Sequence, residues 1–186
     1  MAKLIYAANI SLDGYIEDKR GNIEWTISDD ETYAFWTDFQ RPIGTYLYGR
    51  RMYESMVYWE TANASGEQPE IKREFAQIWR AAEKIVYSRT LQAVSSAKTR
   101  IEREFDPDAI RRLKESSGAD ITIGGPDLAG RAMSAGLIDE CHLLLNPIVL
   151  GGGKLALPDN LRMRLELLSE RRFRSGVVHL HYRVIV

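Results

Sequence analysis

The sequence Tyr46-Leu-Tyr-Gly-Arg-Arg-Met-Tyr-Glu-Ser55 joins a short apolar strand directly to a helical pattern, with Gly49 and Arg50 at the junction. A helix that begins there presents free backbone N–H groups, and the positive end of its dipole, to whatever lies above the strand. Arginine side chains add charged donors, so the place suits a phosphate. We therefore take Gly49, Arg50 and Arg51 as a candidate phosphate site. A glycine turn beside two solvated arginines is the alternative.

A second junction of the same kind lies downstream, in Ile121-Thr-Ile-Gly-Gly-Pro-Asp127. Glycine lets a ligand approach the backbone closely, and the next helix start supplies N–H donors. The candidate residues here are Gly124, Gly125, Pro126, Asp127 and Leu128. The pattern is not G-x-G-x-x-G, so it does not indicate a Rossmann fold. Two such junctions on one sheet predict a domain that holds a phosphorylated dinucleotide across the end of its sheet; a tight turn is the alternative for each.

A third polar segment, Ser88-Arg89-Thr90, ends a strand between the two junctions. Hydroxyl groups beside a guanidinium can hold a ribose 2′-phosphate, which would favour NADPH over NADH. A polar strand end without a ligand is the alternative interpretation.

The composition is that of an ordinary globular protein. The chain has 186 residues, which suits one domain, and 45% of them are hydrophobic and 27% charged. A net charge of -1 gives no reason to expect nucleic acid or an anionic membrane as a partner. Cys141 is the single cysteine, which excludes an internal disulfide and a multi-cysteine zinc site. No export signal and no apolar run of about 18 residues is visible, so we expect a cytoplasmic protein.

Alternation of strands and helices predicts the fold class. Strands are expected over residues 3–10, 45–48, 84–87, 98–103, 121–123 and 140–150, and helices over residues 50–56, 69–79, 107–114 and 127–135. The strand over residues 140–150 should be interrupted or bulged at Asn146-Pro147. A further helix should begin at a capping box formed by Ser28 and Glu31 and end before Pro42. Residues 59–68 are expected to form an exposed loop.

Two segments near the C-terminus, residues 161–167 and 178–186, alternate apolar and polar side chains and predict two half-buried strands. They should form a closing antiparallel hairpin. The whole pattern predicts an α/β domain, residues 1–186, with a mixed sheet and helices on both faces.

The histidines give no clear site. His179 and His181 share one face of a strand, but no third or fourth metal ligand stands at a suitable spacing. Arg183 on the same face argues against a bound cation. We therefore expect an exposed polar face and no metal site. His142 and Cys141 also lack partners in the sequence, and no nucleophile motif is present.

Five segments occur in a fixed order along the chain. They are Leu4–Trp25 with Ser11-Leu-Asp-Gly14, Tyr48–Ser55, Val86–Thr90, Ile121–Leu128, and Asn146–Gly153. Together they resemble the dihydrofolate-reductase-like superfamily, and within it the reductase domain of the bifunctional riboflavin-biosynthesis deaminase/reductase and its stand-alone relatives. The likeness covers nearly the whole chain.

The resemblance implies a three-layer architecture around a mixed, mostly parallel sheet of about eight strands, NADPH as cofactor, and frequently a homodimer. It places Gly49, Arg50 and Arg51 at the cofactor's phosphates, Ser88 and Arg89 at its adenosine ribose-phosphate end, and Gly124 to Leu128 at the pyrophosphate. It places the loop from Asn9 through Asp13 to Trp25 beside nicotinamide and substrate, and Tyr33, Trp36, Tyr53 and Met56 along the substrate cleft.

The expected function is an NADPH-dependent reductase that transfers a hydride to a small heterocyclic substrate, with 5-amino-6-(5-phosphoribosylamino)uracil as the best named candidate. A proton would come from Asp13, the candidate catalytic residue, or from water; Asp13 can also be only a turn residue beside Gly14. Tyr33 stands where dihydrofolate reductases carry an acid, and Ala7 where the riboflavin reductases usually carry a lysine. A dihydropterin reductase and a non-catalytic nucleotide-binding or interaction protein remain alternatives.

Overall fold

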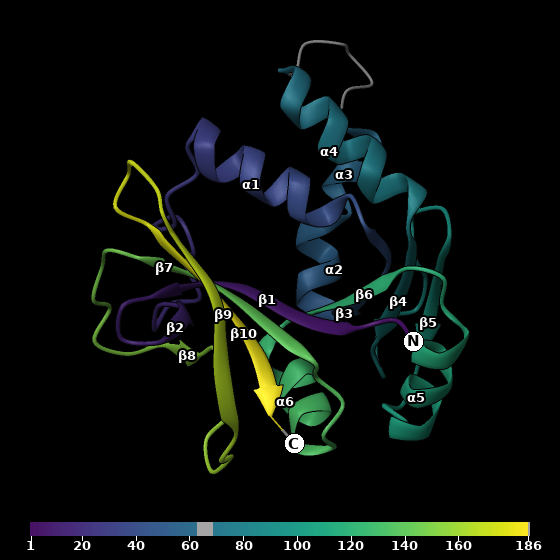
Figure 1. The fold of residues 1–186 in the computed structure, drawn as a ribbon. Coiled ribbons are helices and arrows are strands. Elements are labelled where there is room, and N and C mark those ends of the chain that lie inside the picture. Colours follow the sequence, from purple (N-terminus) through teal and green to yellow (C-terminus); the bar gives the residue numbers. More distant parts are fainter. Residues whose placement is uncertain (63–68, 186) are drawn as a thin grey trace.

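The computed structural model describes residues 1–62 and 69–185, which form an eight-stranded sheet between two layers of helices (Figure 1). The strand order is β5-β4-β3-β6-β1-β7-β10-β9. These strands are β1 (Leu4–Ser11), β3 (Ile43–Gly49), β4 (Glu83–Tyr87), β5 (Thr99–Glu102), β6 (Asp120–Gly124), β7 (Glu140–Asn146), β9 (Arg164–Arg172) and β10 (Val178–Ile185). A separate pair, β2 (Tyr15–Glu17) and β8 (Lys154–Leu155), was not predicted.

Strand direction divides the sheet into two parts. The six strands from β5 to β7 are parallel to their neighbours, and β10 runs antiparallel to both β7 and β9. Parallel strands covered on both faces are apolar along their length. Strand β1 begins with such a run, in which Leu4, Ile5 and Tyr6 are all buried. The predicted mixed, mostly parallel sheet with a closing antiparallel hairpin is confirmed.

The helices are α1 (Asp30–Gln40), α2 (Arg50–Met56), α3 (Tyr58–Thr61), α4 (Glu70–Ala81), α5 (Pro107–Ser116) and α6 (Pro126–Ser134). Figure 1 shows α1 to α4 on one face of the sheet and α5 and α6 on the other. Trp79 of α4 is fully buried, and its indole N–H donates to the Tyr48 hydroxyl of β3 at 3.2 Å. No helix in the described ranges is both long and apolar enough to cross a bilayer.

The start of α1 differs from the prediction. Asp29 is the N-cap: its carboxylate accepts from the Thr32 backbone N–H at 2.8 Å, and the Thr32 hydroxyl accepts from the Asp29 N–H at 3.1 Å. The predicted box of Ser28 and Glu31 is therefore wrong by one residue. The Glu31 carboxylate instead accepts from Arg171 and from the Arg174 backbone N–H, so a contact with the C-terminal hairpin outweighs local capping.

Strand β7 ends at Asn146, where the sequence predicted an interruption or bulge, because Pro147 has no N–H to continue the ladder. Two other boundaries differ from the prediction. Part of the predicted loop over residues 59–68 is helix α3, and residues 63–68 lie outside the described residues. The first hairpin strand begins at residue 164 instead of 161. It is not half-buried, since Leu165 and Leu167 are 36% and 49% exposed on the edge strand.

The histidines are packed more deeply than predicted. His142 and His179 are 9% and 5% exposed, because Phe39 and Phe35 of α1 lie over their rings at centroid distances of 4.7 and 4.5 Å. Burial lowers the pKa of His142 to about 3 and that of His179 to about 4. The predicted exposed face is therefore wrong for His179.

One buried amide joins three segments. The side chain of Asn146 accepts from the Ile27 backbone N–H at 2.8 Å and donates to the carbonyl oxygens of Ile10 and Leu144 at 3.4 and 3.2 Å. These contacts connect the ends of β1 and β7 with the segment that leads into α1. The side chain is 1% exposed, so water cannot replace the lost partners.

We predict that Asn146→Ala lowers the free energy of unfolding by about 1–3 kcal/mol, because it leaves a buried N–H and carbonyl groups without partners. Urea unfolding measured by circular dichroism checks this. The exposed amide variant Gln92→Ala is the control and should change stability little. Equal stability of Asn146→Ala and the wild type would contradict the role assigned to Asn146.

Candidate functional site

Strand register places the three predicted polar segments on one edge of the sheet. Tyr48 of β3 is the Cα partner of Gly124 in β6, and Gly49 is the partner of Tyr87 in β4. The residues that follow, including Gly125 and Ser88, therefore lie at the carboxyl ends of three adjacent parallel strands. The sequence predicted each segment separately, and the structure brings them together.

After two of these strands, the chain continues to opposite faces of the sheet. Strand β3 leads into α2 on one face, whereas its neighbour β6 leads into α6 on the other (Figure 1). In open α/β sheets such a reversal opens a crevice at the carboxyl ends of the strands, where ligands bind. The candidate site therefore lies between the starts of α2 and α6.

The start of α6 has no capping side chain and has open space at Gly125. Gly125 is the N-cap residue, has φ +93°, and makes no side-chain capping contact; an added Cβ would meet no atom within 4 Å. The first N–H groups of a helix have no partner within it, so they can donate to a ligand. Gly124 has another role, because a Cβ there would press on Met52 and Tyr48. The first glycine allows α2 to pack, and the second leaves the helix start open.

The start of α2 contacts the end of β4. Arg50 donates from Nη1 to the Thr90 hydroxyl at 2.9 Å and from Nε to Glu54 at 2.7 Å. Arg89 pairs with Glu104 at 2.8 Å and is 71% exposed. The Ser88 hydroxyl accepts from the Leu91 backbone N–H at 3.0 Å and so forms part of the turn. Two accessible guanidinium groups thus lie on neighbouring segments.

Arg51 forms an ion pair that the sequence did not indicate. Its guanidinium binds the Glu17 carboxylate through two hydrogen bonds of 2.9 and 3.1 Å. Glu17 belongs to β2, so this pair connects the loop after β1 to the start of α2. Strand β8 lies against β2, and Lys154 at its start binds the Asp127 carboxylate of α6. No local pattern links residues so far apart in the sequence.

Asp13 anchors one loop to another. Its carboxylate accepts from the Ser11 hydroxyl at 2.7 Å and from the backbone N–H groups of Leu150 and Gly151 at 3.1 and 2.8 Å. The hydrogen bond from Ser11, followed by those from the two amides, holds the pKa of Asp13 below its usual value. A carboxylate stabilised in its charged form is a poor proton donor. This geometry favours the turn role of Asp13 over proton transfer.

The residues assigned to the substrate cleft separate into groups. Tyr33 and Met56 pack on the core cluster beneath α2 and α4. The Tyr33 hydroxyl is buried and has no hydrogen-bond partner among the described residues, which makes it a candidate ligand contact. Tyr53 is 3% exposed, and its hydroxyl accepts from the Ser95 backbone N–H at 2.9 Å. Tyr53 is thereby part of the core.

The other three assigned residues lie elsewhere. Trp36 packs against the cluster of Leu144, Phe173 and Val177. Asn9 is half-buried opposite Leu144, and the Trp25 indole donates to the Asn22 carbonyl oxygen at 2.9 Å.

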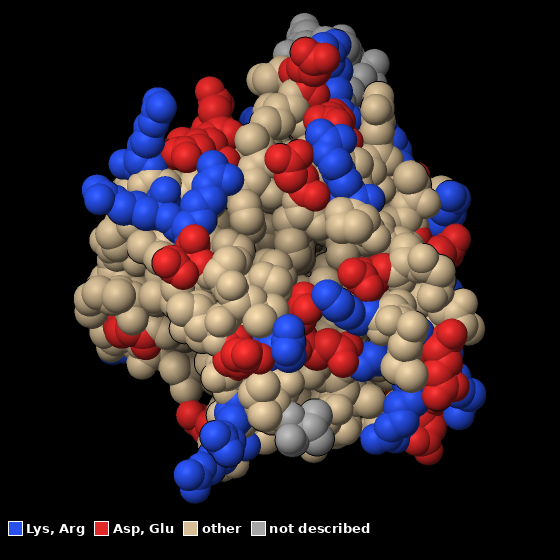
Figure 2. Space-filling model, viewed as in Figure 1, with Lys and Arg blue, Asp and Glu red and all other residues tan. Residues whose placement is uncertain are grey.

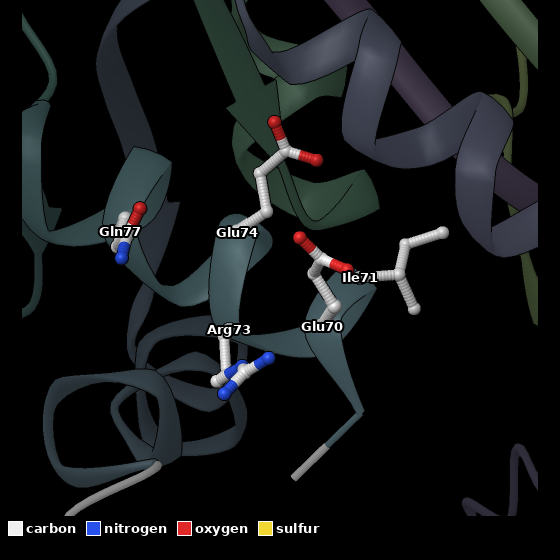
Figure 3. A pocket seen from close by; sticks show the side chains of 5 residues that line it. All are labelled: Glu70, Ile71, Arg73, Glu74 and Gln77. Carbon is white, nitrogen blue, oxygen red and sulfur yellow. The ribbon is translucent and has the colours of Figure 1, made fainter. Parts of the chain in front are cut away.

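Two surface hollows occur among the described residues. One, of about 940 Å³, is bordered by Pro126, Asp127 and Lys154 and extends along α6 to Leu157. The other, of about 650 Å³, is bordered among the described residues by side chains of α4 (Figure 3). Figure 2 shows basic and acidic side chains interspersed over one face of the molecule, as expected from 25 Lys and Arg and 26 Asp and Glu. Neither hollow joins the three polar strand ends.

A family model described as the RibD C-terminal domain matches residues 2–179. The chain belongs to this family. The uncharacterized protein YyaP of Bacillus subtilis is 32% identical over 182 residues, covering 97% of this chain and 94% of YyaP. The predicted resemblance to riboflavin-type reductase domains is confirmed.

Solved structures share the fold of this RibD C-terminal domain. A pyrimidine reductase-like protein from Corynebacterium diphtheriae has a TM-score of 0.71 at 16% identity, with 100% of this chain and 92% of that chain covered. A deaminase/5-amino-6-(5-phosphoribosylamino)uracil reductase from Thermotoga maritima gives 0.68 at 15%, covering 99% and 57%. A dihydrofolate reductase from Enterococcus faecalis, complexed with NADP(H), gives 0.65 at 13%, covering 99% and 97%. At such identities the likeness shows the fold alone.

We predict that Gly153→Ala destabilises the protein by about 1–3 kcal/mol, because its φ of +143° is strained for alanine and its Cβ would overlap the Glu17 carbonyl oxygen. Gly49→Ala is the matched control, since its φ is -71° and its Cβ would meet no atom within 4 Å. Urea unfolding of both variants checks the packing of β2 on β8. Equal stability of the two variants would contradict it.

Proposed function

We propose that this protein is a reductase that binds NADPH across the carboxyl ends of β4, β3 and β6. The observation that carries the proposal is the alignment of Gly49, Ser88 and Gly125 on three adjacent strands, with helices starting on opposite faces. Membership of a reductase-domain family supports it. A dihydrofolate reductase of the same fold is known in complex with NADP(H).

The chain's own groups fit the charged parts of this cofactor. The start of α6 at Gly125 suits a pyrophosphate, since no side chain caps the N–H groups that follow Pro126 and a Cβ at Gly125 would meet no atom within 4 Å. Arg50, Arg89 and Thr90 form a cationic, hydrogen-bonding surface for the 2′-phosphate that distinguishes NADPH from NADH. Arg51 joins them when its pair with Glu17 is exchanged for a phosphate contact.

The nicotinamide is assigned to the open side of β1. Strand β6 pairs with β1 only from Leu4 to Tyr6, whereas β7 pairs with it from Ile5 to Ser11. The last part of β1, including Asn9, therefore has no strand on the β6 side within the described ranges. Its backbone groups are available to a carboxamide there. The bound cofactor supplies a hydride, and the protein supplies binding, orientation and exclusion of water.

The substrate we assign is a heterocycle with a reducible C=N bond, of the riboflavin-precursor kind that the Thermotoga protein's name states. Dihydrofolate fits less well. Tyr33 replaces the expected acid, while Asp29 caps α1 and Glu31 binds Arg171. The Asp29 and Glu31 carboxylates are both engaged in these contacts, so neither is free to protonate a pterin. With Asp13 engaged between two loops, we assign the proton to water.

We also propose that the protein forms a homodimer through the sheet edge, because β9 is an edge strand with Leu165 and Leu167 exposed. Light scattering coupled to size-exclusion chromatography tests this, and a monomer at working concentration would contradict it.

Turnover tests the reductase proposal. NADPH oxidation should occur with 5-amino-6-(5-phosphoribosylamino)uracil and be much slower with dihydrofolate. Tight NADPH binding without hydride transfer to either compound would instead favour a non-catalytic nucleotide-binding protein.

We predict that Arg50→Ala weakens NADPH binding by about 1.5–3 kcal/mol, the range for losing a hydrogen bond to a charged group. Isothermal titration calorimetry measures the change. Arg100→Ala is the matched control, because Arg100 is a similarly exposed arginine that pairs with Glu102 on β5. Unchanged affinity in Arg50→Ala, or an equal loss in Arg100→Ala, would remove the role given to Arg50.

A further inference from the structure

All three histidines of the chain lie in one cluster with Glu140. His142 of β7 is the cross-strand partner of His181 in β10, and Glu140 precedes His142 by two residues. Side chains two apart on a strand share a face, and so do cross-strand partners. The cluster is therefore built by the pairing of β7 with the C-terminal hairpin, on the face that α1 covers.

Three potential ligand atoms converge there. Glu140 Oε2 lies 3.1 Å from His181 Nε2 and 3.9 Å from His142 Nε2, and the ligand atoms of all three residues lie within 4.8 Å of one another. Atoms that share a tetrahedral zinc ion at ~2.1 Å lie roughly 3.4 Å apart. The His142 and His181 rings are stacked at a centroid distance of 3.9 Å, so the set closes when the ligand atoms move inward and the half-exposed His181 ring rotates to aim its Nε2 at the ion. The ladder between β10 and β9 shifts register directly after His181, where a strand can adjust.

The third histidine orients one of the ligands. His142 Nδ1 and His179 Nε2 are 3.1 Å apart, so the Nδ1 side of His142 is hydrogen-bonded and its Nε2 faces Glu140. Metal-binding histidines almost always use their second ring nitrogen in such a contact, which fixes the ring and its tautomer. Phe39 lies over the His142 ring and restricts water on that side.

We propose that Glu140, His142 and His181 bind a zinc ion, and that His179 is a positioning residue for His142. Two imidazoles and one carboxylate are a ligand set suited to Zn²⁺, with a water in the fourth position. His181 has a side-chain exposure of 21%, which gives the ion and the water an entry path. Binding replaces the hydrogen bond between His181 and Glu140: neutral His181 takes the tautomer protonated at Nδ1, so its Nε2 lone pair is available to the ion.

Two neighbouring cationic side chains, Lys3 and Arg183, do not prevent zinc from binding. Lys3 binds the other carboxylate oxygen of Glu140, Oε1, at 2.7 Å, and its side chain is 52% exposed and able to move. Arg183, which in the sequence argued against a cation, pairs with Glu166 at 3.2 Å. The cluster begins at the amino end of β7, whereas the cofactor crevice lies at the carboxyl ends of the strands. The zinc proposal is therefore independent of the proposed reductase function.

Zinc titration of tag-free, chelator-treated protein, in competition with a fluorescent chelator, tests the site. We expect one zinc ion per chain and a higher melting temperature, because the ion binds only the folded protein. His181→Gln should lose this zinc. Glu166→Gln, which removes a nearby carboxylate outside the set, should keep it. No zinc binding by the wild type, equal binding by His181→Gln, or an equal loss in Glu166→Gln overturns the proposal.

The positioning role of His179 has its own readout. His179→Gln should weaken zinc binding by about 10- to 100-fold and keep the visible spectrum of the cobalt-loaded protein, because the three ligands are unchanged. A lost cobalt spectrum in a folded variant overturns this role.

If the variants do not fold, ¹⁵N imidazole NMR of the wild type decides the question. Zinc should shift the Nε2 resonances of His142 and His181, and unshifted resonances overturn the proposal.

Discussion

The parallel pairing of β3 with β6 is the constraint on which the candidate site depends. Tyr48 lies opposite Gly124, so β3 and β6 end at the same level at the edge of the sheet. The helices that follow them, α2 and α6, lie on opposite faces. A register shift of one residue would turn alternate side chains to the other face and separate the two helix starts. The small size of Gly124 allows Met52 of α2 to pack close to this pair.

Short patterns of adjacent residues made much of the fold and of the candidate site predictable. A strand that ends in glycine before a helix can be recognised from adjacent residues, as at Gly49 and Gly125, and the order of the segments then indicated the fold. The sequence could not show that Arg51 binds Glu17, or that Glu140 lies beside His142 and His181, because these contacts depend on strand pairing and loop position. The N-cap at Asp29 instead of Ser28 also depends on a distant contact, because the C-terminal hairpin binds the Glu31 carboxylate.

The two ends of the parallel strands carry different chemistry. At the carboxyl ends, a helix start without a side-chain cap and exposed arginines favour an anionic ligand, and the carboxylate of Asp13 keeps the adjoining loops in place. Towards the amino end of β7, buried imidazoles and the Glu140 carboxylate favour a cation. Asn146 lies at the far end of the same strand and connects it to the start of α1. Strand β7 thus carries the histidine cluster towards one end and the Asn146 contacts at the other.

Parallel fluorescence titrations with NADPH and NADH test the central claim most directly, because four tryptophans can report binding by energy transfer to the reduced nicotinamide. The account predicts that NADPH binds and that NADH binds much more weakly, since Arg50 and Arg89 meet a 2′-phosphate that NADH lacks. Binding of neither nucleotide would contradict the assignment of the crevice. Equal binding of both would contradict the assignment of the two arginines.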